Sequence, residues 1–189
     1  MSHDHQKKLP DMDSIIENME KEVSNLTDLI DSNPNDANTY SRRGLLLGQL
    51  VRPKEAIDDF TKAISINPED STLFYNRGMA YVHVKQLSLA IDDFTQSADI
   101  DPGNVDAISN AAMAHYESCH YDVAIRESDR AIKIDPERSL PYAVRALANA
   151  ALGEEELAKD NLAKAVKYGF DPHTLGMLIK QARRNRQEN

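Results

Sequence analysis

Three stretches of the sequence run into a proline through nearly the same residues: Ile64-Ser65-Ile66-Asn67-Pro68, Ala98-Asp99-Ile100-Asp101-Pro102 and Ile132-Lys133-Ile134-Asp135-Pro136. Successive prolines of this set are 34 residues apart, and Pro34 continues the same spacing towards the N-terminus. Because proline disfavours helix at the residue before it, each stretch predicts the end of one helix and the start of a new unit. The chain is therefore predicted to be an array of 34-residue units.

Each unit is predicted to hold two amphipathic helices. In residues 71–104, Phe74, Gly78 and Tyr81 follow the spacing of one helix face, and a second such face begins at Ala90. A short polar break separates the two faces. Two helices joined by a tight turn form a helical hairpin.

Small residues recur at fixed places of the unit, counted from its first residue. A small side chain lets paired helices approach closely, and larger neighbours then fill the gaps. We expect places 8, 20 and 27 to be buried in every hairpin. The residues are Gly44, Gly78, Ala112 and Ala146, then Ala56, Ala90, Ala124 and Ala158, then Ala63, Ser97, Ala131 and Ala165.

The composition fits an all-helical chain. Among 189 residues there are 7 Gly, 8 Pro and no Trp, and the formal net charge is −9. Low Gly with plentiful helix formers favours helix over sheet. The negative charge disfavours non-specific binding to nucleic acid or to an anionic membrane, so we expect neither as a partner.

The sequence resembles the tetratricopeptide repeat (TPR) family. That family prefers an aromatic or large apolar residue at place 4, Leu at 7, a small residue at 8, an aromatic at 11 and 24, Ala at 20 and 27, and Pro at 32. Over four units, 24 of these 32 slots fit by residue class. The resemblance implies an all-α fold, a right-handed α-solenoid of TPR hairpins.

The departures from the family pattern carry their own expectations. Place 7 holds Arg43, Arg77, Ala111 and Arg145 instead of Leu. We expect each Arg stem to cover apolar surface while its head reaches water. The third unit is weaker, with His115 at place 11, and the fourth has Phe170 where proline is expected.

The sequence predicts a capping helix at each end of the repeat array. Apolar stripes predict the two caps: Ile15, Met19, Val23, Leu26 and Ile30 in the first, and Leu175, Leu178, Ile179 and Ala182 in the second. Ser14 and Glu17 form a candidate capping box at the start of the first. We expect a disordered tail (1–13), an N-terminal capping helix (14–36), four TPR units (37–70, 71–104, 105–138 and 139–172), and a C-terminal capping helix with a basic tail (173–189).

His115, Cys119 and His120 come nearest to a metal or catalytic cluster. No second pair of ligands at metal spacing accompanies them, so we interpret His115 as a core residue and Cys119 as an ordinary thiol. His3 and His5 stand in a polar start and are interpreted as a bare tail. We expect no metal and no cofactor.

Two acid pairs, Asp58-Asp59 and Asp92-Asp93, recur at the same places of successive units. Repetition at the structural period indicates a shared surface position rather than a catalytic pair. Because the sequence also has no glycine-rich phosphate loop and no nucleophile motif, we expect no enzymatic activity.

The resemblance implies a peptide-binding groove. In similar proteins the first helices of the units line a concave groove through places 2, 5, 6, 9 and 13. Amides at such places can both donate to and accept from an extended backbone, and Tyr and Met offer adaptable apolar contact. The candidate groove residues are Arg42, Tyr75, Asn76, Met79, His83, Asn110, Met113 and Glu117.

One family ligand is disfavoured. TPR proteins that bind the acidic C-terminal tails of cytosolic heat-shock chaperones carry Lys, Arg and Asn at five such places. Only Asn76 fits when the comparison starts at the first unit, and only Asn110 when it starts at the second. The carboxylate clamp is therefore absent.

We expect a cytoplasmic adaptor that binds an extended or helical segment of another protein. The alternative is a bacterial secretion-type chaperone for one client, because such chaperones are similarly short, acidic repeat proteins with an extra N-terminal helix. The polar start lacks the apolar core of a signal peptide, and no run of about eighteen apolar residues predicts a membrane span.

Overall fold

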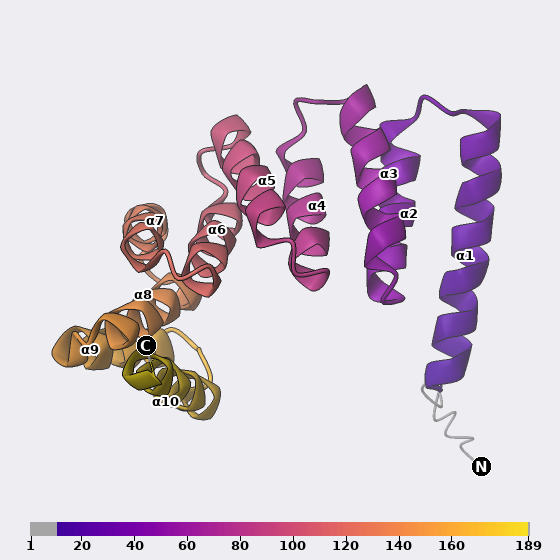
Figure 1. Ribbon diagram of the computed structural model, residues 1–189. Helices are drawn as coiled ribbons and strands as arrows, with labels where there is room; N and C mark the ends of the chain where they lie inside the picture. Colours follow the sequence, from indigo (N-terminus) through magenta and orange to yellow (C-terminus); the bar gives the residue numbers. More distant parts are fainter. Residues whose placement is uncertain (1–10, 189) are drawn as a thin grey trace, which may run out of the picture. The chain divides into compact units, whose positions relative to one another are not determined.

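The computed structural model describes residues 11–188, and this range is all-helical (Figure 1). No strand occurs within it, so the predicted all-α class is confirmed. The helices are α1 (Met12–Ser32), α2 (Ala37–Gln49), α3 (Pro53–Ile66), α4 (Ser71–His83), α5 (Leu87–Ile100), α6 (Val105–Glu117), α7 (Tyr121–Ile134), α8 (Ser139–Leu152), α9 (Glu155–Lys167) and α10 (Pro172–Glu188).

The chain divides after Pro68 into two compact units. The first holds α1 and the hairpin α2–α3. The second holds the hairpins α4–α5, α6–α7 and α8–α9, followed by α10. Helices end at Ser32, Ile66, Ile100 and Ile134, two residues before the periodic prolines, as the spacing predicts.

α1 begins earlier than predicted. Its N-cap is Asp11, whose Oδ1 accepts a hydrogen bond from the Ser14 backbone N–H at 2.8 Å. The predicted capping box at Ser14 is therefore wrong, because Asp11 already satisfies the free amides of the first turn. Residues 12 and 13 belong to the helix, and residues 1–10, with His3 and His5, lie outside the described range.

The twelve small residues at places 8, 20 and 27 are all buried, as predicted. Two glycines show why the site must be small. A Cβ on Gly44 would lie 3.0 Å from the Phe60 ring, and one on Gly78 would lie 2.8 Å from the Phe94 ring. The aromatic residue of the second helix thus occupies the space that a side chain on the first would need.

The fifteenth residue of each hairpin sits in the left-handed backbone region at the turn. The φ angle is 58° at Val51, 61° at both Lys85 and Cys119, and 88° at Gly153. Glycine adopts this conformation freely, whereas an L residue does so at a cost that is greatest for β-branched Val. Packing of the paired helices therefore imposes the turn on three hairpins whose local sequence does not favour it.

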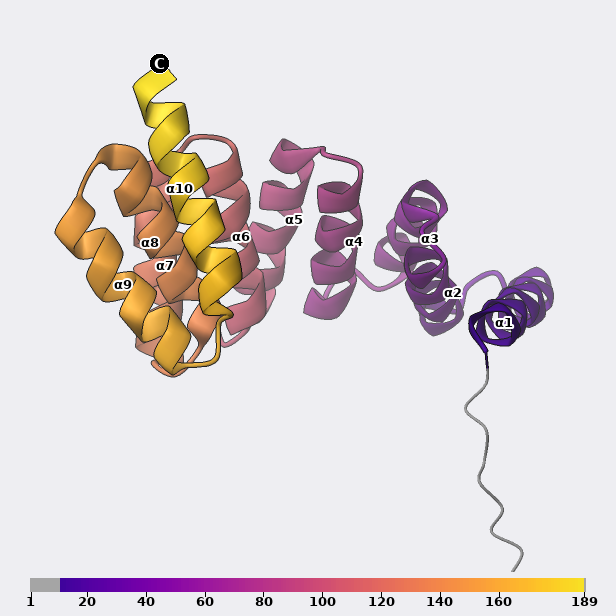
Figure 2. The same cartoon turned by 90° about the horizontal axis from the view of Figure 1, so that it is seen from below.

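α10 packs against α8, and Figure 2 shows it lying across that helix. Leu175, Ile179 and Ala182 are buried there together with Leu147 of α8. Leu178 is 42% exposed, so its predicted place in the buried stripe is wrong. Its neighbours at 175, 179 and 182 already follow the three-to-four-residue spacing of the contact face.

Candidate functional site

Seven of the eight candidate groove residues lie on two first helices of the second unit. Places 5, 6, 9 and 13 follow each other at spacings that keep them on one side of a helix. The α4–α6 face, as we call this set, consists of Tyr75, Asn76, Met79 and His83 on α4 and Asn110, Met113 and Glu117 on α6.

A hydrogen bond joins the two helices across this face. Asn110 Nδ2 donates to Tyr75 Oη at 3.4 Å and to the Asp106 carbonyl oxygen at 2.8 Å. Burial, and then the nearby charge of Asp106, raises the pKa of Tyr75, so the phenol stays protonated. The Asn110 amide nitrogen is thus engaged within the protein, and its Oδ1 remains to accept from a ligand.

Three further residues of the face are partly buried: Asn76, Met79 and Met113. Met79 packs against the cluster around Phe94, and Met113 against the cluster around Leu147. The side-chain amide of Asn76 has no hydrogen-bond partner among the described residues. An unpaired amide beside polarizable thioethers can hold a peptide backbone and accept varied side chains.

The face stops at the fourth hairpin. The equivalent α8 residues Val144, Leu147 and Ala151 are buried, the last two in the same cluster as Leu175 and Ile179 of α10. At the C-terminal ends of α4 and α6, His83 is exposed, and Glu117 Oε2 lies 4.0 Å from Lys85 Nζ. α10 therefore leaves α4 and α6 as the accessible part of this surface in the second unit.

Arg42, the eighth candidate, belongs to the first unit. Its Nη2 lies 3.0 Å from Glu22 Oε1 of α1, and both side chains are well exposed. An exposed pair of this kind contributes about 0–1 kcal/mol to stability, so its guanidinium can exchange partners at little cost.

Arginine–aspartate pairs inside two hairpins were missed from the sequence. Asp59 accepts from Arg43 Nε and Nη2 at 2.8 and 2.7 Å, and Asp93 accepts from Arg77 at 2.8 Å twice. Asp59 and Asp93 are only 4% and 5% exposed, so their predicted surface position is wrong, as is the prediction that these arginine heads reach water. The hydrogen bonds to aspartate raise the pKa of Arg43 and of Arg77.

The signal for these pairs was the 16-residue offset between place 7 and place 23. The fourth hairpin lacks this pair because place 23 is Asn161. Its Arg145 instead donates a hydrogen bond to Asp129 of α7. The third hairpin also lacks the pair, with Ala111 at place 7 and Glu127 at place 23.

Two family models match the chain, both described as tetratricopeptide repeat, over residues 37–70 and 71–104. These bounds coincide with the first two units deduced from the proline spacing. Residues 37–104 are therefore two tandem tetratricopeptide repeats. The third and fourth hairpins follow the same period in the structure, and their assignment as further TPR units remains a prediction.

Solved structures of TPR proteins share this fold. YrrB, a TPR protein with an unusual peptide-binding site, matches with a TM-score of 0.74 at 22% identity, over 90% of this chain and 86% of its own. MamA from Desulfovibrio magneticus RS-1 matches with 0.74 at 18% identity, over 85% and 97%. The first TPR of Spaghetti (RPAP3), bound to the HSP90 peptide SRMEEVD, matches with 0.60 at 21% identity, over 62% and 93%. No curated protein sequence matches significantly.

The two matched repeats support protein interaction as the broad class of function of this protein. Across residues 11–188, no helix is long and apolar enough to cross a membrane. No cluster of three or more His, Cys, Asp or Glu in that range is arranged to hold a metal ion.

Near the third turn, His115 is partly buried and His120 is exposed. The His115 and His120 rings lie 5.9 Å apart, and burial, followed by the charge of His120, lowers the pKa of His115. His115 Nδ1 is buried without a hydrogen-bond partner. Cys119 is exposed at the turn, and its hydrogen bond with Tyr121 raises the pKa of that phenol to about 12.

Proposed function

We propose that this protein is an adaptor whose α4–α6 face binds an extended segment of a partner protein. The supporting observation is the row of partly exposed amide, aromatic and methionine side chains at matching places of adjacent hairpins. Tyr75 and Asn110 join the two helices, and Asn76 offers an unpaired amide. Such a row can hold a peptide backbone and still choose among side chains.

The register suits an extended chain. Packed helices lie about 8–10 Å apart, and a strand rises about 3.3 Å per residue. Asn76 and Asn110 occupy the same place of adjacent hairpins, so they are expected to meet backbone groups about three residues apart. The peptide-binding structures of YrrB and Spaghetti support binding by this fold, although this chain lacks the residues that would clamp an acidic tail.

The test is affinity on variants of the face. Peptides selected against the full chain from a displayed library would be titrated by calorimetry. A net hydrogen bond contributes about 0.5–1.5 kcal/mol, so Asn76→Ala should weaken binding about two- to tenfold with an unchanged Tm. Lys133→Ala, an exposed change on α7, is the matched control. Wild-type affinity in Asn76→Ala, Met79→Ala and Met113→Ala would place the binding surface elsewhere.

The adaptor role and its location need a separate measurement. An adaptor holds a partner that is already soluble, whereas a secretion-type chaperone raises the solubility of one client. Co-expression with the identified partner, followed by its soluble yield, separates the two. The proposal assigns the adaptor to the cytoplasm, which cell fractionation would test.

A further inference from the structure

One arginine of the first unit shows how this fold binds a guanidinium group. Thr27 Oγ1, 16 residues before Arg43, accepts from Arg43 Nη1 at 2.9 Å. Asp59, 16 residues after it, accepts from Nε and Nη2. The Thr27 hydroxyl also donates to the Val23 carbonyl at 2.9 Å, which aims its oxygen lone pairs at the arginine. Two helices, α1 and α3, thus supply the acceptors for an arginine on α2.

Acceptors recur at the same two offsets around the third hairpin, on α5 and α7, but the arginine is missing. Thr95 lies 16 residues before position 111 and Glu127 lies 16 after it, but position 111 is alanine. Thr95 donates its hydroxyl to the Ile91 carbonyl at 2.8 Å, as Thr27 does to Val23. Ala111 is 4% exposed and carries no polar group. The position of the guanidinium is therefore free of any side chain from place 7.

A pocket of about 90 Å³ lies there, inside the second unit. A volume of this kind holds several water molecules, and so accommodates a guanidinium group of four heavy atoms. Its apolar wall includes Phe94 and Ile108. Its polar lining is formed by Thr95, His115, Glu127 and Arg130.

His115 adds a third acceptor. Its Nδ1 is buried and has no hydrogen-bond partner. Because burial lowers the pKa of His115, the ring is neutral near pH 7, and one ring nitrogen of a neutral imidazole accepts. Glu127, Thr95 and His115 together match the several N–H donors of a guanidinium better than the compact head of an ammonium.

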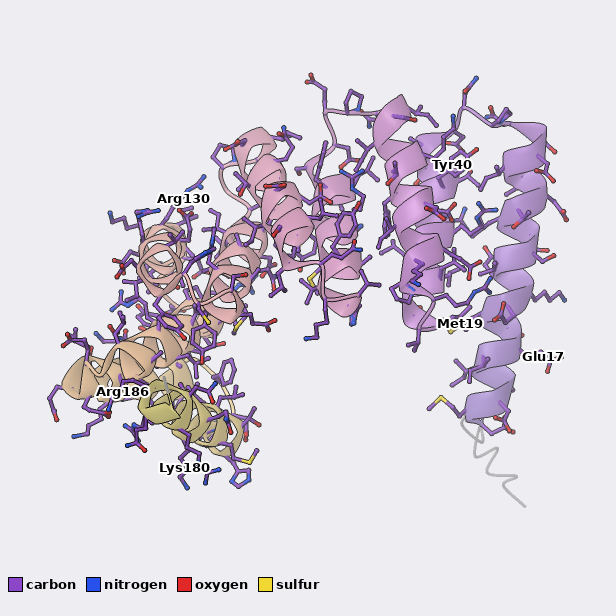
Figure 3. The ribbon with its side chains drawn as sticks, in the orientation of Figure 1. Glu17, Met19, Tyr40, Arg130, Lys180 and Arg186 are labelled. Carbon is purple, nitrogen blue, oxygen red and sulfur yellow. The ribbon has the colours of Figure 1, made fainter. Side chains whose placement is uncertain are left out.

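Arg130 is the side chain of this protein that would compete with a guanidinium ligand for the Glu127 carboxylate. Its Nη1 lies 3.6 Å from Glu127 Oε2, beyond hydrogen-bond distance, and its side chain is 41% exposed. Figure 3 labels Arg130 on α7. A loose pair on one exposed helix edge contributes little, so a ligand can displace it from the carboxylate.

We propose that this pocket binds a guanidinium group supplied from outside the chain. An arginine side chain of a partner protein and free arginine both carry this group. The pocket lies on another side of α6 from Asn110 and Met113, so the proposal is independent of the α4–α6 face.

The test is an NMR titration of the full chain with methylguanidinium, with methylammonium as the matched control. The amide signals of Ala111, His115 and Glu127 should shift with methylguanidinium and stay unchanged with methylammonium. N-acetyl-arginine amide and free arginine separate the two sources, because only the first imitates a residue within a protein; the tighter of the two identifies the source.

Two variants and one control variant test whether binding occurs at this pocket. Ala111→Arg supplies the guanidinium from place 7, so it should raise the Tm and abolish the response. Glu127→Gln should weaken binding at least about tenfold because it removes the charged acceptor, while Glu137→Gln, an exposed acid elsewhere, should bind as wild type. Equal shifts with methylammonium, no shift with methylguanidinium, or a wild-type response in Glu127→Gln would overturn the proposal.

Discussion

At the scale of single residues, the repeat imposes geometry that the local sequence does not favour. Val51 is the clearest case, since a β-branched residue sits at a φ of 58° and is 85% exposed. Its side chain contributes little burial to offset that backbone cost. Gly153 occupies the equivalent position of the fourth hairpin without strain.

Val51→Gly is expected to stabilise the protein by about 1 kcal/mol. Relief of the left-handed conformation recovers about 1–2 kcal/mol, and the greater flexibility of glycine in the unfolded state offsets part of that gain. The measurement is the free energy of unfolding from urea titration. Val51→Ala, which removes the branch but keeps Cβ, should fall between the two. A less stable Val51→Gly would show that the turn is not strained.

Arg43 and Asp59 form the second residue-scale prediction. Arg43→Leu alone should cost about 3–5 kcal/mol, because Asp59 would keep its charge in a buried position without its partner. Arg43→Leu combined with Asp59→Leu should return to within about 1 kcal/mol of wild type, since leucine is apolar and of similar bulk. The stability of the single and the double variant would be compared with that of wild type by thermal unfolding. A double variant as unstable as the single one would mean that the ion pair itself stabilises the hairpin.

At the scale of helices, the sequence predicted what the period controls. The helix pairs, the prolines at their ends and the buried small residues all follow from one 34-residue repeat. The buried state of Asp59 and Asp93 did not, because an acid on an amphipathic helix looks the same whether it faces water or an arginine 16 residues away. The apolar stripe of residues 175–182 predicted a second cap, but not that this cap packs on α8, since a terminal helix can pack on either neighbour.

The contact of α10 with α8 predicts a capping role. Removing residues 173–189 should expose Ala143 and Leu147, lower the Tm and promote association through the bared apolar patch. Differential scanning calorimetry and light scattering measure both effects. Removing only residues 184–189 keeps Leu175 and Ile179 and is the matched control. Equal stability of both truncations and wild type would make α10 an appendage.

At the scale of the whole molecule, the hairpins follow one repeat pattern, and the two proposed binding sites lie where residues depart from that pattern. α4 and α6 keep partly exposed amides and methionines where α8 has a buried apolar row. Ala111 leaves a pocket where the first two hairpins bury an arginine. The candidate face could be placed from the sequence because its places recur, whereas the pocket could not, because it depends on what a neighbouring helix omits.

The central claim is that a partner segment lies on the α4–α6 face, and methyl NMR of the methionines tests it most directly. The chain has 6 methionines, of which Met79 and Met113 belong to the face, while Met12 and Met177 are exposed elsewhere. With a selected peptide added, the Met79 and Met113 methyl signals should shift, and those of Met12 and Met177 should not. Shifts at Met12 or Met177 with unchanged Met79 and Met113 would contradict the claim.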